Sequence, residues 1–194
     1  MMRLFILLFL VVLTACSGAV FRGAVANHKP VRISGNVREV VNENLQQYKG
    51  LLEAAATKDS KVLVFPEFGL YSDTKNRTAL SIVAEQIGAK GGLPCDDFSL
   101  HQQLQSPIIY QMSCAAKETK VAALVNMIDY VKCNNEDDKK CPDDGFYLYN
   151  TDIGLSSSGE FQAKYHKSHE YFGLKPQFNV PETPDYEIWT LENV

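Results

Sequence analysis

One acidic residue follows directly after a strand-like apolar run. Residues Val62-Leu63-Val64-Phe65 form a continuous apolar stretch that Pro66 stops, and Glu67 comes next. Such a run is typical of a strand buried on both faces. Open α/β sheets place their sites past the C-terminal ends of such strands. We therefore expect burial to raise the pKa of Glu67 and to make it a usable general base, the alternative being a solvent-facing carboxylate that merely ends a strand.

A second group of candidate residues lies in Lys164-Tyr165-His166-Lys167. A lysine ammonium there could stabilise an anionic intermediate. Alternation along a strand puts Tyr165 and Lys167 on one face and Lys164 and His166 on the other, so only one of the two lysines can point into a given cleft. The alternative is a basic edge strand that discourages aggregation.

Helices and strands alternate around these residues. A helix followed by a buried strand implies an α/β arrangement. Spacing of apolar residues, caps and turn residues predicts helices at 37–56 (capped by Asn36 with Glu39), 80–87 and 107–116 (opened by Ser106-Pro107), strands at 62–65 and 121–128, a β-hairpin of 147–153 and 161–167, and a strand-like segment at 186–191.

Composition limits the possible classes of protein. The chain has 194 residues, of which 45% are hydrophobic and 22% charged, enough for one domain with a real core. This composition excludes wholesale disorder. The net charge of -4 lacks the basic excess that would attract phosphate backbones, so we expect no nucleic-acid partner.

The N-terminus has the pattern of a secretory signal. Met1-Met2-Arg3 is a cationic start, Leu4 to Leu13 is apolar, and Thr14 to Gly18 supplies small residues for cleavage. The run is too short to span a bilayer comfortably. We therefore expect a signal peptide at 1–18, a single domain at 19–194 and a secreted or extracellular protein. A buried N-terminal element, or a bacterial lipoprotein with a lipidated Cys16, are the alternatives.

Four further cysteines fit an oxidising compartment, because an even number favours disulfides there. Cys133 and Cys141 bracket a polar loop at 134–140, and their spacing suits a loop staple rather than a C-x-x-C metal knuckle. We expect these two to pair, which leaves Cys95 with Cys114. Four unpaired thiols are the alternative.

A single glycosylation sequon and two histidines complete the candidate sites. Asn76-Arg77-Thr78 is the only Asn-x-Ser/Thr sequence and a reasonable glycan acceptor in a secreted chain, which favours a eukaryotic source over the lipoprotein alternative. His166 and His169 could bind a metal only with further ligands that the sequence does not offer. We therefore expect neither a metal nor another cofactor.

Three segments in order carry a resemblance to a known family. They are the Phe65-Pro66-Glu67 strand end, the Cys-flanked loop that leads through 141–152, and Lys164-Tyr165-His166-Lys167. Together they resemble the carbon-nitrogen hydrolase (nitrilase) superfamily, and within it the secreted vanin (pantetheinase) and biotinidase branch. The resemblance runs from about Phe21 to the end of the chain.

The resemblance implies an α-β-β-α sandwich and a Glu-Lys-Cys triad that hydrolyses small non-peptide amides such as pantetheine or biotinyl amides. By position, Glu67 matches the general base and Lys167 the lysine that supports the tetrahedral intermediate. Lys164 is then the strand's ordinary outward residue. The cysteine would attack the amide carbonyl, expel the amine and leave a thioester that water cleaves.

The resemblance also implies a departure from the family pattern. In the family the nucleophilic cysteine lies on a strand after the segment that here reads 185–194, and all four later cysteines precede Lys167. We expect a sandwich incomplete at its C-terminus and a chain inactive by itself. A non-catalytic secreted glycoprotein that keeps the fold for binding is the alternative. Membrane attachment would require a C-terminal anchor, and no oligomeric state follows from the sequence.

Overall fold

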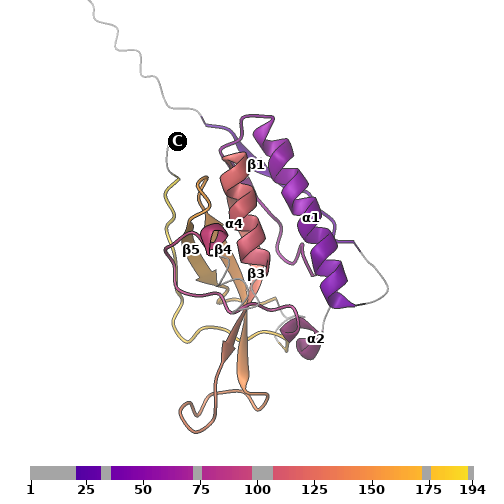
Figure 1. The fold of residues 1–194 in the computed structure, drawn as a ribbon. Helices are drawn as coiled ribbons and strands as arrows, with labels where there is room; N and C mark the ends of the chain where they lie inside the picture. Colours follow the sequence, from indigo (N-terminus) through magenta and orange to yellow (C-terminus); the bar gives the residue numbers. More distant parts are fainter. Residues whose placement is uncertain (1–20, 32–35, 72–75, 98–106, 172–175, 192–194) are drawn as a thin grey trace, which may run out of the picture.

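A five-stranded mixed sheet organises the chain. The computed structural model describes residues 21–31, 36–71, 76–97, 107–171 and 176–191 (Figure 1). In sheet order the strands are β1 (Gly23–Val25), β2 (Val62–Val64), β3 (Ala122–Lys132), β4 (Phe146–Leu155) and β5 (Phe161–His166). Strands β1, β2 and β3 pair in parallel, and β4 pairs antiparallel with both β3 and β5, so β5 runs in the same direction as β2. The expected α/β class is confirmed.

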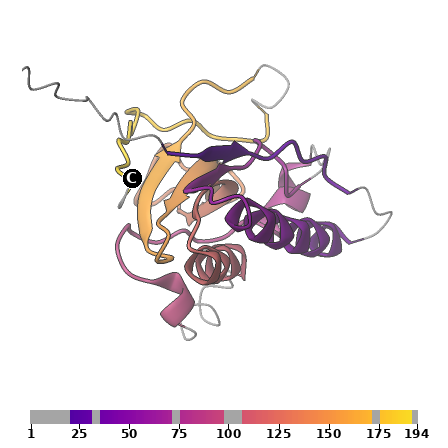
Figure 2. The same cartoon turned by 90° about the horizontal axis from the view of Figure 1, so that it is seen from above.

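Two long helices, α1 (Val37–Ala56) and α4 (Pro107–Thr119), cover one face of the sheet (Figures 1 and 2). The short α2 (Arg77–Ser81) and the 3-10 turn η1 (Pro94–Asp96) lie in the connection between β2 and α4. The described residues therefore form one helical layer on one sheet, which is half of the α-β-β-α sandwich expected from the resemblance.

Burial in β2 corrects one expectation. Leu63 and Phe65 are 3% and 5% exposed, but Val62 and Val64 are only partly buried. The strand is not buried on both faces, because α1 and α4 cover only the face that carries Leu63. On that face it packs into a core that includes Leu45, Tyr48, Leu52, Ile108, Met112, Ala123, Val125 and Met127.

Helix α1 has the expected bounds. The Asn36 side chain caps it by accepting a hydrogen bond from the Arg38 N–H at 3.0 Å. Its apolar residues recur at helical spacing and are buried against the sheet, so local pattern and tertiary packing agree. For the helix predicted to begin at Ser106-Pro107, Ser106 lies outside the described residues, and α4 begins at Pro107.

The helix predicted at 80–87 is wrong. Helix α2 ends at Ser81, and Glu85 instead pairs with β3, donating its N–H to the Ile128 carbonyl and accepting from the Tyr130 N–H. The Glu85 carboxylate accepts hydrogen bonds from the Ile108 and Ile109 N–H groups at the start of α4. These non-local partners outweigh the local helical spacing.

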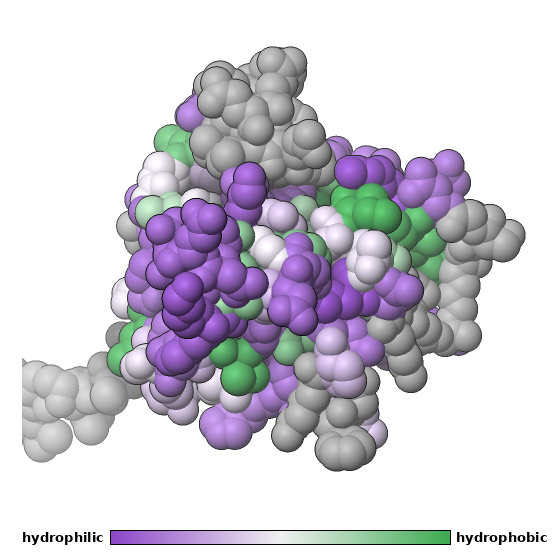
Figure 3. Space-filling view, turned by 90° about the horizontal axis from the view of Figure 1, so that it is seen from below, coloured by the Kyte–Doolittle hydropathy of each residue, from purple (hydrophilic) through white to green (hydrophobic). Residues whose placement is uncertain are grey.

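The β3–β4 hairpin is the longest strand pair and ends in a polar loop. Its strands pair from Ala123↔Leu155 to Lys132↔Phe146, and a disulfide between Cys133 and Cys141 closes the loop beyond them. The loop projects from the lower end of the molecule in Figure 1. Seen from that end, the surface is mostly hydrophilic, with hydrophobic residues only in small separate patches (Figure 3).

The strand predicted at 186–191 is also wrong. This segment has no regular structure and is attached through side chains: Trp189 Nε1 donates to Gln162 Oε1 at 2.7 Å, and Lys90 pairs with Glu187. The Trp189 ring also lies against Gly154 of β4. A strand needs a neighbouring strand to pair with, and the strand-like composition of this segment does not supply one.

Candidate active site

The two residues predicted to do chemistry meet at the end of the parallel strands. Glu67 follows β2 and Lys167 follows β5, and Lys167 Nζ lies 2.5 Å from Glu67 Oε1. The backbone N–H of Lys167 donates to the Asn150 carbonyl, which fixes the lysine beside β4. The structure thus places both residues together, with Glu67 47% and Lys167 26% exposed at the side chain.

Two buried asparagines hold the Glu67 carboxylate in place. Asn150 Nδ2 donates to Glu67 Oε1 at 2.7 Å, and Asn126 Nδ2 donates to Asn150 Oδ1 at 2.8 Å. Asn126 Oδ1 in turn accepts from the backbone N–H of Phe68 at 2.9 Å. Asn126 therefore fixes both the amide that touches Glu67 and the backbone directly after it.

The turn after β2 aims Glu67 into the pocket. Phe68 has φ of 60°, an uncommon left-handed conformation for an aromatic residue, and its N–H is the group that Asn126 holds. The next residue, Gly69, packs against Tyr48 so closely that a Cβ atom there would lie 1.9 Å from the Tyr48 hydroxyl oxygen. Glycine is thus required at this position.

The charge state of Glu67 differs from the expected one. Burial raises the pKa of Glu67, but hydrogen bonds from Lys167 and Asn150 lower it more, so on balance the pKa is below its ordinary value. The sequence-based expectation of a raised pKa is therefore wrong for this structure. In the ion pair with Lys167 the carboxylate is already ionised and oriented to accept a proton.

Two further carboxylates lie beside this pair. Glu170, 1% exposed at the side chain, has Oε2 3.9 Å from Lys167 Nζ and 3.5 Å from Asn150 Nδ2. Asp152 Oδ1 accepts from Asn126 Nδ2 at 3.0 Å. Burial raises the pKa of both carboxyl groups. The Lys167 ammonium is thus the central positive charge among three acidic side chains.

These side chains enclose an open pocket of about 280 Å³. A pocket of this size suits a small molecule rather than a protein chain. The residues that line it are all polar or charged: Glu67, Asn126, Asn150, Asp152, Tyr165, Lys167 and His169.

The other lysine of the motif faces away from the pocket, as strand alternation predicts. Lys164 is not an outward residue, however: its Nζ lies 3.6 Å from Asp129 Oδ2 and donates to the carbonyls of Ile87 and Gly88. His166 lies on the same side and contacts Asp129 Oδ2 at 2.9 Å. The buried Asp129 carboxylate, 1% exposed, draws Lys164 inward.

Comparison with known proteins identifies the family. The carbon-nitrogen hydrolase family model matches residues 24–184, which is most of the chain and includes both Glu67 and Lys167. The chain belongs to the carbon-nitrogen hydrolase family.

Curated relatives of this carbon-nitrogen hydrolase include proteins named pantetheinase and biotinidase. The chain is 32% identical to pantetheinase of Homo sapiens over 190 residues, which cover 93% of this chain and 36% of that protein. It is 29% identical to biotinidase of Takifugu rubripes over 156 residues, 78% of this chain and 30% of that protein. The chain thus spans about a third of the length of these relatives.

Solved structures show the same fold. An amidase from Nesterenkonia sp. superposes with a TM-score of 0.54 at 15% identity, covering 87% of this chain and 52% of the amidase. At this identity the likeness concerns the fold, and it agrees with the nitrilase type expected from the sequence.

Every described cysteine of this carbon-nitrogen hydrolase is in a disulfide. Cys133 is joined to Cys141, and Cys95 to Cys114, the same two pairs that the sequence led us to expect. A disulfide sulfur is not a thiolate nucleophile. Cys16 lies outside the described residues.

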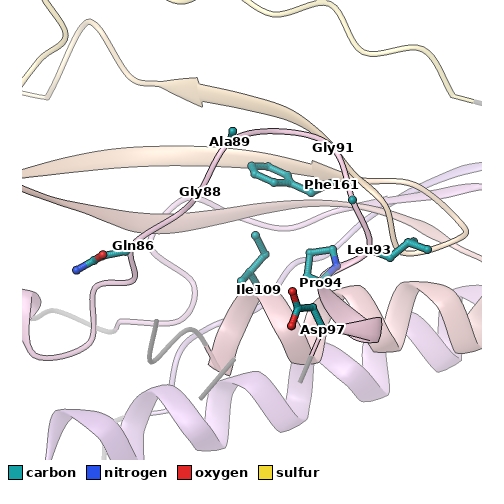
Figure 4. A pocket seen from close by; sticks show the side chains of 10 residues that line it. Gln86, Gly88, Ala89, Gly91, Leu93, Pro94, Asp97, Ile109 and Phe161 are labelled. Carbon is teal, nitrogen blue, oxygen red and sulfur yellow. The ribbon is translucent and has the colours of Figure 1, made fainter. Parts of the chain in front are cut away.

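A second pocket offers less chemistry. It measures about 170 Å³ and lies between the loop that follows Glu85 and helix α4 (Figure 4). Phe161 and Ile109 form its apolar wall, and Asp97 is its one charged lining residue. Nowhere in the described part of the chain do three or more His, Cys, Asp or Glu side chains gather as a metal site would require.

The sequence did not reveal the supporting residues of the site. Asn126 is the one polar residue in the strand predicted at 121–128, which is a signal that a buried polar role could have explained. Asn150 and Asp152 lie in a segment that carried the family resemblance but had no assigned role. Glu170 gave no signal, because only the fold brings its side chain to Lys167.

Proposed function

We propose that this chain is the N-terminal part of a secreted amidase that hydrolyses small non-peptide amides, such as pantetheine or biotinyl amides. The observation that carries the proposal is the Glu67–Lys167 pair in the lining of a small pocket. The named relatives, pantetheinase and biotinidase, support amides of this class.

Each residue then has a defined task. Glu67, ionised and held by Asn150, takes the proton from a cysteine thiol and later returns it to the departing amine. The thiolate attacks the amide carbonyl, the C–N bond breaks, and water cleaves the resulting thioester. Lys167 stabilises the negative charge of the tetrahedral intermediate. Because the described cysteines are paired, we place the nucleophile on a strand beyond Val194.

Secretion and glycosylation are part of the proposal. The apolar run at 4–13 and the small residues after it support cleavage of residues 1–18, and two disulfides suit an oxidising compartment. Asn76 is exposed at the N-cap of α2, where its Oδ1 accepts from the Ala79 N–H at 3.1 Å. A glycan on Nδ2 would leave this cap intact. No described helix has the length and apolar character of a membrane span.

A second candidate function is binding without catalysis. The observation that favours it is the pairing of Cys95, Cys114, Cys133 and Cys141, since the described pocket then has a base and a cation but no thiol. A secreted glycoprotein of this kind would retain the pocket and hold an amide without cleaving it.

One experiment separates the two functions. Hydrolysis of pantetheine and of a biotinyl amide is measured for the chain ending at Val194 and for a protein that continues to a cysteine-bearing strand. We expect turnover only from the longer protein, and its loss in Glu67→Gln and in Lys167→Ala. Failure of the longer protein to cleave any amide would favour the binding function. Thiol-reagent-sensitive hydrolysis by the shorter chain would contradict the placement of the nucleophile.

A further inference from the structure

The pocket around Glu67 and Lys167 carries an acidic residue that the hydrolytic mechanism does not use. Asp152 lies on β4, lines the pocket, and is paired across the ladder with Tyr165 of β5, which lines the same pocket. The proton transfers of amide hydrolysis are assigned to Glu67 and the charge stabilisation to Lys167. A third group with a separate task is therefore available in the wall.

The Asp152 carboxylate is rigidly held at one oxygen. Asn126 Nδ2 donates to its Oδ1 at 3.0 Å, and Asn126 is itself 4% exposed and bonded to Phe68 and Asn150. Within the described ranges, no second hydrogen-bond donor reaches this carboxylate. One oxygen is thus fixed by a neutral amide, and the group still has capacity to accept in the pocket.

A carboxylate in this setting favours a ligand with a donor. Burial raises the pKa of Asp152, which shows that its charge is poorly solvated, and Glu67 adds to the same effect. An N–H or O–H group that donates to the carboxylate compensates for the lost water. Hydrogen bonds to an ionised acceptor are among the stronger ones available for recognition.

We infer that Asp152 selects the substrate by accepting a hydrogen bond from an N–H or O–H group on the acyl part of the amide. The inference rests on the proposed function, because it takes the amide to be held between Glu67 and Lys167. The substrate class is a neutral amide whose acyl part carries amide or hydroxyl donors. Acyl chains that end in a carboxylate are disfavoured, since Glu67, Asp152 and Glu170 would repel them.

The test compares three thiol-bearing amides that differ only in the acyl part. Pantetheine has hydroxyl and N–H donors there, N-(2-mercaptoethyl)hexanamide has none, and N-(2-mercaptoethyl)succinamic acid ends in a carboxylate. Binding to the 194-residue chain is followed by NMR through the side-chain amide signals of Asn126 and Asn150, so no turnover is needed. Asp152→Asn is compared with wild type and with the control Asp143→Asn, which alters an exposed carboxylate of the hairpin loop.

We expect wild type and the control to bind pantetheine about tenfold more tightly than the hexanamide, as one charge-assisted hydrogen bond would give. They should bind the succinamic acid most weakly of the three. Asp152→Asn should lose the preference for pantetheine while still binding the hexanamide, and its Asn126 signals report whether the wall is intact.

A second measurement does not depend on the variant's folding. In wild type, the preference for pantetheine should fall as the pH drops through the raised titration range of Asp152, because a protonated carboxyl is a poorer acceptor. Glu67, Lys167, Tyr165 and His169 line the same pocket, and Glu170 lies beside Lys167, so the ratio of the two affinities is compared rather than either affinity alone. A ratio that is independent of pH, or a preference retained in Asp152→Asn, overturns the inference. If wild type binds none of the amides, the inference also fails, whereas the proposed function is decided separately by turnover of the longer protein.

Discussion

Lys167 and Glu67 are 100 positions apart in the chain, and their side chains meet with Nζ 2.5 Å from Oε1. The contact joins the turn after β2 to the residue after β5, and strands β3 and β4 lie between these two strands in the sheet. Asn126 of β3 and Asn150 of β4 fill the space between them by hydrogen bonds. Each of these four strands therefore contributes to the position of one carboxylate.

The two lysines of the motif should separate activity from stability. Lys167→Ala should abolish turnover in the longer protein. Lys164→Ala should retain turnover but lower the free energy of unfolding by about 1–2 kcal/mol, because the buried Asp129 loses a charged partner. The sequence alone predicts only that Lys164→Ala has a mild effect on turnover. Urea denaturation together with amide hydrolysis checks both changes, and equal losses of turnover would mean that the lysine roles are wrongly assigned.

Asn126 is the residue on which the position of Glu67 most depends. Asn126→Ala leaves the Phe68 N–H and the Asn150 and Asp152 oxygens without their partner. We expect the free energy of unfolding to fall by about 2–4 kcal/mol, since buried unpaired polar groups are costly. Urea denaturation measures the change, with the exposed Asn135→Ala as control. Similar midpoints for both variants would show that the hydrogen-bond relay contributes little.

The parts that local pattern could predict are those in which neighbours in sequence are also neighbours in space. The bounds of α1 follow from its apolar spacing and the Asn36 cap, and the hairpin of β4 and β5 follows from alternation around a turn. The same alternation correctly separates Lys164 from Lys167. Glu67 could be selected because a strand end marks a site in α/β sheets.

The parts that pattern could not predict depend on distant partners. Glu85 leaves the expected helix because β3 and the start of α4 bind it, more than 20 positions away. The lowered pKa of Glu67 arises from Lys167 and Asn150, neither of which is a sequence neighbour. Burial of β2 on a single face likewise depends on which layers surround the sheet. Secondary structure was therefore easier to predict than the electrostatics of the site.

The close packing of Gly69 gives a sharp test of the turn that aims Glu67. Gly69→Ala would place a Cβ atom 1.9 Å from the Tyr48 hydroxyl oxygen and 2.9 Å from Pro66 Cγ. We expect destabilisation of about 1–3 kcal/mol. The matched control Gly50→Ala, in α1 with nothing within 4 Å of the added atom, should stabilise by about 0.5–1 kcal/mol.

A double variant identifies the clashing atom. Tyr48→Phe removes the hydroxyl that the new Cβ meets, and this hydroxyl has no hydrogen-bond partner in the structure. Adding Tyr48→Phe to Gly69→Ala should therefore recover part of the lost stability in thermal denaturation. If the two changes simply add, the Tyr48 hydroxyl is not the atom that the new Cβ meets.

Glu85 should make the stability of the chain depend on pH in the neutral range. Burial raises its pKa from 4.5 to about 8, although two backbone N–H groups of α4 favour the ionised form. Between these values the folded chain keeps a proton that the unfolded chain releases, so this carboxyl stabilises the fold fully below pH 4.5 and its contribution is lost as the pH rises through about 8.

Glu85→Gln removes the titrating group while keeping an oxygen that can accept from the Ile108 N–H. In wild type, the free energy of unfolding should fall between about pH 5 and pH 8. In Glu85→Gln this slope should be less steep, by close to the contribution of one proton. Glu118→Gln, a change in the last turn of α4 whose side chain lies away from this site, serves as control. Urea denaturation across this pH range measures the slopes. An unchanged slope in Glu85→Gln would show that Glu85 is ionised in the folded chain and that the helix N-terminus, rather than burial, decides its charge.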